Sequence, residues 1–116
     1  IDNQNNFEIL KELKYYRVPR LLIVFLYDES VENEVKSELV KFGKKATLAT
    51  LDFIKNLELS FKNLRIFKAC LDVLGKLRDE RALETILEIE ALNKQTINNE
   101  SIQDSIDVAL FRIRGY

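Results

Sequence analysis

Apolar residues recur at steps of three and four along almost the whole chain, which is the spacing of amphipathic α-helices. Leu64, Phe67, Leu71 and Leu74 show this spacing clearly. Short polar stretches interrupt the apolar runs, so the pattern indicates about seven helices joined by short loops. The predicted helices span residues 7–16, 17–27, 31–42, 46–54, 61–77, 82–92 and 101–113.

The predicted helices repeat one order of apolar and small positions. With a shift of 36 residues, the stretch 66–77 falls on 102–113, and its apolar or small positions coincide. With a shift of 32 residues, Gly43 falls on Gly75, and an apolar run precedes each glycine. Such self-similarity predicts helical hairpins that each leave one apolar face open, so that neighbouring hairpins must stack to bury it.

The stretch LDVLGKLRDERALETIL, residues 71–87, stops and restarts its apolar pattern within a few residues. We interpret Gly75 and the charged residues after it as the turn inside one hairpin, because glycine commonly follows a helix. The helix before this turn is then the outer helix of the repeat, and the helix after it is the inner one. By the same reasoning Gly43 should end an earlier helix, and Ser101 should cap the last one.

The segment ACLDVLGKLRDERALETIL, residues 69–87, resembles the HEAT-like repeat family, especially the short bacterial and archaeal type named for phycobilisome lyases. Residues 15–43 carry a similar order of motifs. The last copy, 101–113, has Phe111 where the family has glycine. The resemblance covers about residues 7–114 and implies an all-α, right-handed α-solenoid of about three and a half hairpins.

Composition supports a single helical domain. Hydrophobic residues make up 47% of the 116 residues, which is enough for one core. With 3 Gly and 1 Pro the chain is poor in turn residues, which disfavours an all-β fold. No apolar run approaches the ~18 residues of a membrane span. We expect residues 1–6 to be a disordered or linker edge and 7–116 to form one domain. Since methionine is absent, we expect it to belong to a longer protein.

The residue types limit the chemistry that the chain can perform. It has no histidine, so Ser–His and Cys–His nucleophile pairs are excluded. Its single cysteine, Cys70, falls at a core position of the repeat and should be buried rather than reactive. A lone cysteine also slightly favours a cytoplasmic location. We therefore expect a protein that is not an enzyme, with no catalytic residue, metal or cofactor.

In HEAT-like arrays the inner helices line a concave face, and we expect a partner to bind there. The candidate positions are Arg20, Ile23, Asp52, Glu80, Glu84 and Glu88. The three glutamates form what we call the acidic ridge, Glu80, Glu84 and Glu88, at steps of four along one helix. Two interpretations stay open: the ridge is a solvated face relieved by neighbouring lysines, or it binds a basic segment of a partner.

The C-terminal edge is a second candidate surface. Phe111 and Tyr116 add aromatic area there, and no following inner helix completes the last hairpin. Solenoids need polar ends to stay soluble, and this end does not look polar in the sequence. Either further chain, another protein or a second copy covers the edge, or Phe111 and Tyr116 fold over the last hairpin as a local cap.

These observations predict a non-enzymatic protein–protein interaction scaffold. Its partner would be another protein or further repeats of the same parent chain. Nucleic acid is disfavoured, because a net charge of −1 is not the footprint of a general nucleic-acid binder. The alternative is a non-catalytic or substrate-holding segment of a lyase-like or DNA-glycosylase-like HEAT protein.

Overall fold

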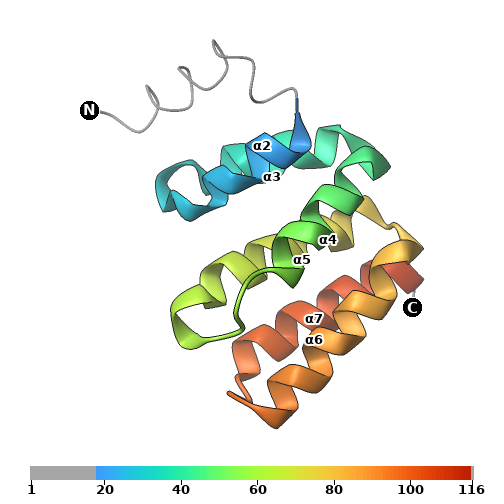
Figure 1. Cartoon of the computed structure of the whole chain (residues 1–116). Coiled ribbons are helices and arrows are strands. Elements are labelled where there is room, and N and C mark those ends of the chain that lie inside the picture. Colours follow the sequence, from blue (N-terminus) through green and yellow to red (C-terminus); the bar gives the residue numbers. More distant parts are fainter. Residues whose placement is uncertain (1–17, 116) are drawn as a thin grey trace.

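The computed structural model describes residues 18–115, and throughout that range the secondary structure is helical, without strands (Figure 1). The predicted helix 7–16 and the predicted linker 1–6 lie outside the described residues. Five short 3₁₀ segments join or extend the α-helices: η2 (Ile23–Tyr27), η3 (Glu29–Val31), η4 (Gly43–Ala46), η5 (Phe61–Asn63) and η6 (Glu80–Ala82). The α-helices are α2 (Pro19–Leu22), α3 (Glu32–Lys41), α4 (Thr47–Lys55), α5 (Leu64–Leu77), α6 (Leu83–Gln95) and α7 (Glu100–Arg114).

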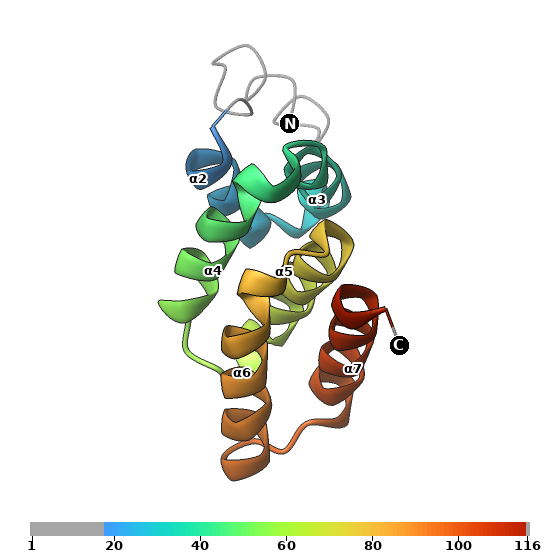
Figure 2. The ribbon, with the colours of Figure 1, turned by 90° about the vertical axis from the view of Figure 1, so that its right-hand side faces the viewer.

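The helices form two layers. Viewed from the side, α2, α4 and α6 follow one another down one layer, and α3, α5 and α7 follow one another down the other (Figure 2). Helix α5 lies in the middle and packs against α3, α4 and α7, whereas α6 packs mainly against α7. Each layer therefore buries one face of the other, as two packed helical layers around one core require.

The starts of the helices follow the repeat read from the sequence. Helices α3, α5 and α7 begin at Glu32, Leu64 and Glu100, which are separated by the two predicted shifts. A 3₁₀ segment precedes α4 as η4 and α6 as η6, so these two helices also begin alike. The helix starts therefore coincide with the shifts of 32 and 36 residues.

The predicted pairing inside the hairpins is wrong. Helix α4 packs with α5, and α6 packs with α7. The segment between α5 and α6 therefore connects two helix pairs and does not lie inside one hairpin. Gly75 is not in the turn but within α5, which continues to Leu77. The left-handed residue that reverses the chain is Arg78, with φ of 52°. Gly43, by contrast, follows α3 with φ of 64°, as predicted for a glycine after a helix.

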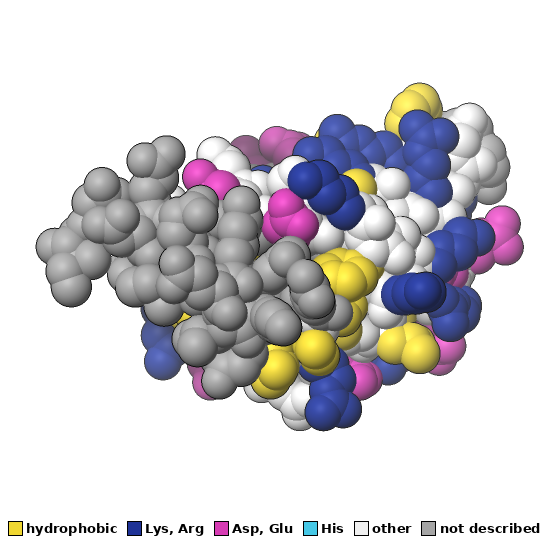
Figure 3. Space-filling model, turned by 90° about the horizontal axis from the view of Figure 1, so that it is seen from above, with side chains coloured by type: hydrophobic (Ala, Val, Ile, Leu, Met, Phe, Trp, Pro, Cys, Tyr) yellow, Lys and Arg dark blue, Asp and Glu magenta, His cyan; other side chains and the backbone are white. Residues whose placement is uncertain are grey.

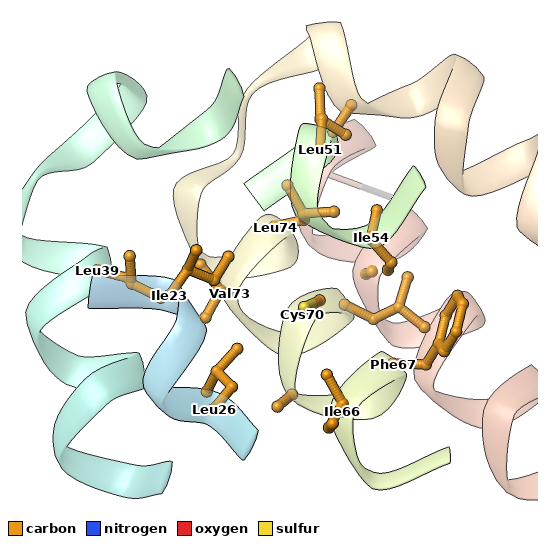
Figure 4. Packing of buried hydrophobic residues seen from close by; sticks show 14 of the residues in the cluster. Ile23, Leu26, Leu39, Leu51, Ile54, Ile66, Phe67, Cys70, Val73 and Leu74 are labelled. Carbon is orange, nitrogen blue, oxygen red and sulfur yellow. The ribbon is translucent and has the colours of Figure 1, made fainter. Parts of the chain in front are cut away.

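The core is centred on α5, which buries side chains around most of its circumference (Figure 4). Cys70 is completely buried among aliphatic side chains, which confirms its predicted core position. This burial raises the pKa of the Cys70 thiol far above its usual value. The buried residues of α5 are Ile66, Phe67, Ala69, Cys70, Leu71, Val73, Leu74, Gly75 and Leu77.

Polar side chains fix the ends of the helices. The Asp79 carboxylate accepts a hydrogen bond from the Arg81 backbone N–H at 3.0 Å and so caps η6. The Asn99 side chain accepts one from the Ile102 N–H at 3.0 Å and caps α7. Ser101, which the sequence analysis expected to be this cap, lies inside α7. Among residues 18–115, no helix has both the length and the apolar character that crossing a membrane requires.

Candidate functional site

The acidic ridge is exposed along one helix. Glu80 lies in η6, and Glu84 and Glu88 lie one and two turns further on along α6. All three side chains face solvent. Within residues 18–115, no lysine or arginine forms an ion pair with them. Ion pairs with neighbouring lysines, which would relieve the repulsion, are therefore not seen within these residues.

The other predicted positions in this layer lie on helical segments other than those of the ridge. Arg20 on α2 and Asp52 on α4 are exposed, each on its own helix. Ile23 is only 2% exposed, so its predicted solvent-side position is wrong. The reason is local: α2 ends at Leu22 and the chain continues as the tighter 3₁₀ segment η2, which packs against α3.

Phe111 lies on α7, in the layer opposite to the ridge, and is 61% exposed. It therefore does not fold over the last hairpin, and Tyr116 lies outside the described residues. The edge around it is more polar than the sequence analysis expected. The Gln103 side chain donates hydrogen bonds to Glu90 at 2.7 Å and to Asp107 at 3.0 Å. By the shift of 36 residues, Gln103 takes the place of a buried phenylalanine, Phe67.

A cluster that sequence reasoning missed ties the second layer together. Asp72 on α5 lies 3.2 Å from the Lys36 ammonium of α3 and 3.2 Å from the Lys76 ammonium of α5. It also accepts a hydrogen bond from the Arg112 guanidinium of α7 at 2.9 Å. Partial burial opposes ionisation, but these three cations outweigh it and hold the pKa of the Asp72 carboxyl below its usual value. One carboxylate thus bridges three helices.

A groove beside this cluster runs between α3 and α5. It encloses about 400 Å³, and we call it the lysine groove. Three ammonium groups, two neutral polar side chains and one valine line it, and no carboxylate belongs to the lining. Viewed from above, lysine and arginine dominate the charged side chains of the visible surface (Figure 3). The lining residues are Asn33, Lys36, Ser37, Val40, Lys41 and Lys76.

A second groove, between α5 and α7, has a different character. Its volume is about 280 Å³, and Lys68, Asp72 and Asp104 are its charged lining residues. Charges of both signs therefore offset one another there. The lysine groove, by contrast, has a lining whose charges are all positive.

Two titratable groups with shifted pKa values lie in the core and at a helix cap. Residues 18–115 contain no group of three or more Cys, Asp or Glu side chains placed to hold a metal ion. Cys70 has no access to solvent, and its raised pKa keeps the thiol protonated. The Arg81 guanidinium holds the pKa of Asp79 well below its usual range, and this pair serves the η6 cap. Comparison of the chain with protein-family models, curated proteins and solved structures gives no match.

Proposed function

We propose that the protein is a non-enzymatic protein-interaction module, built as a short right-handed α-solenoid of HEAT-like hairpins. The observation that carries the proposal is the acidic ridge, whose exposed carboxylates have no ion-pair partner in residues 18–115. The stacked order of α3, α5 and α7, with helix starts at the repeat spacings, supports the solenoid arrangement. Stacked hairpins with exposed polar faces suit binding of an extended partner.

The ridge has a physical reason to bind a basic segment. Like charges one turn apart on a helix oppose each other by ~0.2–0.5 kcal/mol per pair. A partner segment that brings lysine or arginine beside Glu84 and Glu88 removes this repulsion and adds attraction. Because the glutamates are exposed, the attraction is screened by salt, and its main effect falls on the rate and selectivity of association.

A labelled peptide of alternating lysine and alanine tests the ridge. Fluorescence anisotropy at low salt should show weaker binding of this peptide, by roughly threefold, when Glu84 and Glu88 are changed to Gln. The control variant E34Q/E58Q removes the same charge from two exposed glutamates elsewhere and should change the affinity less. Equal effects of the two double variants, or no binding by the wild-type chain, would show that the ridge is a solvated face without a binding role.

A further inference from the structure

We infer that the lysine groove is a docking site for an acidic, carboxylate-rich segment of a partner protein. This site deepens the proposed function, and rests on it, by naming the chemistry of a partner. Its residues are separate from those of the acidic ridge. The ridge lies on η6 and α6, whereas the groove lies between α3 and α5 in the other layer. The two surfaces therefore differ in sign, in position and in the partner that each would accept.

The charges around the groove do not balance. Asp72 is shared by Lys36, Lys76 and Arg112, so no cation of this cluster has the carboxylate to itself. Glu32 is likewise shared, by Lys36 and by Arg65. In the connected ion pairs around Asp72 and Glu32, four cations meet two carboxylates, whereas Lys41 pairs separately with Glu38. The cations of this network are Lys36, Arg65, Lys76 and Arg112, and its carboxylates are Glu32 and Asp72.

Two of the lysines can reach a partner without disturbing the fold. The Lys41 side chain is 69% exposed and the Lys76 side chain is 48% exposed, whereas Lys36 is 21% exposed. Lys36 can therefore remain on Asp72, while Lys76 turns from Asp72 and Lys41 turns from Glu38 towards added carboxylates. Charge-assisted hydrogen bonds of this kind are among the stronger polar contacts that a surface offers.

The remaining lining suits a polypeptide. Asn33 and Ser37 can hydrogen-bond to the backbone of a bound segment, and the Val40 side chain gives an apolar contact. No aromatic side chain lines the groove, so stacking of nucleotide bases has no platform there. These features favour an acidic protein segment over nucleic acid.

The test uses a short fluorescein-labelled peptide of alternating glutamate and alanine as the probe. We expect the full chain to bind it at low salt and the variant K41Q/K76Q to bind it roughly tenfold more weakly. The control variant K62Q/K94Q removes two exposed lysines that lie outside the groove, so its affinity should change by less than about twofold. Thermal unfolding of both variants should match the wild type, since Lys36 and Arg112 still hold Asp72.

Several outcomes would overturn the inference. Equal losses in K41Q/K76Q and K62Q/K94Q would mean that only net charge matters. Tighter binding of a random double-stranded DNA, lost in K41Q/K76Q, would assign the groove to nucleic acid. Self-association in sedimentation that K41Q/K76Q abolishes would assign it to a second copy. The variant E84Q/E88Q should still bind the acidic peptide. A failure of the groove proposal can therefore be distinguished from a failure of the proposal that the ridge binds a basic segment.

Discussion

A β-carbon placed on Gly75 would lie only 3.1 Å from the Cα of Ala109 and 3.3 Å from the Cδ of Arg112. Helices α5 and α7 therefore approach each other closely at this point, because Gly75 has no side chain and Ala109 has only a methyl group. Because Gly75 lies within α5 rather than in a turn, its role is to permit this contact. The closeness of α5 and α7 in turn places Arg112 beside Asp72.

Replacing Gly75 by Ala should destabilise the protein. Alanine favours the helix by up to ~1 kcal/mol over glycine, but overpacking a tight contact costs ~1–3 kcal/mol. The Cα of Ala109 belongs to a helix backbone and cannot turn aside as a side chain would, so we expect a net loss of about 1 kcal/mol. Urea unfolding followed by circular dichroism measures it. A G75A variant as stable as the wild type would show that α7 shifts freely.

Gly43 provides a contrasting substitution. No heavy atom lies within 4 Å of a β-carbon built there, but its φ is 64°. G43A should therefore lose roughly 1–2 kcal/mol through backbone strain alone. A double variant with G75A should show additive losses, since the two residues act by independent mechanisms.

Cys70 should be unreactive in the folded protein. It is fully buried, and burial raises the pKa of its thiol, so the thiolate that attacks disulfide reagents is scarce. We expect slow modification by an aromatic disulfide reagent in buffer and rapid modification in denaturant. Cys70→Ser should cost ~1–3 kcal/mol, because a hydroxyl would be buried without an assured partner. Fast labelling of the native chain would contradict the burial.

The acid sensitivity of the fold should depend on Asp72 and Asp79. The pKa of each carboxyl is lowered in the folded state, by the cations around Asp72 and by Arg81 beside Asp79. These carboxyls bind protons more readily in the unfolded chain, where their pKa is near 3.8. The stability that they contribute is therefore fully present above about pH 5 and falls as the pH drops through that pKa and below it. Thermal melts between neutral pH and about pH 3 should show this decline beginning near about pH 5.

Removing the charge should flatten that decline. Asp79→Asn keeps an oxygen for the Arg81 N–H but no longer titrates, so its stability should vary less below about pH 5. Asp104→Asn is the control, because this exposed aspartate has no ion pair among residues 18–115. An unchanged pH profile in D79N would mean that other carboxyls govern acid unfolding.

The sequence predicted the positions of the helices better than it predicted which helices contact each other. Apolar spacing located every described helix, because each helix must bury one face wherever it packs. It could not determine which helices pair, because α5 is apolar on so many sides that several partners are compatible with it. The 3₁₀ segment η2 changed the residue spacing and so displaced Ile23 from the predicted face.

The candidate surfaces differ in the same way. The acidic ridge could be predicted from the sequence, since its residues follow one another at steps of four along η6 and α6. The lysine groove could not, because its residues come from α3 and α5 and meet only through tertiary packing. Within the Asp72 cluster, one ion pair could be predicted from local sequence spacing. It joins Asp72 to Lys76, four residues away on the same helix.

Phe111→Ser should change stability by less than about 0.5 kcal/mol, as substitutions at exposed positions usually do.

The surroundings of Phe111 also disfavour self-association through the C-terminal edge. Gln103 bonds to Glu90 and Asp107 there, where a stacked hairpin would need apolar side chains. The area that a single exposed aromatic side chain can bury is far smaller than the ~1,000 Å² that a stable interface needs. We therefore expect sedimentation to give a monomer at every concentration. A concentration-dependent mass that Phe111→Ser abolishes would instead identify this edge as the dimer contact.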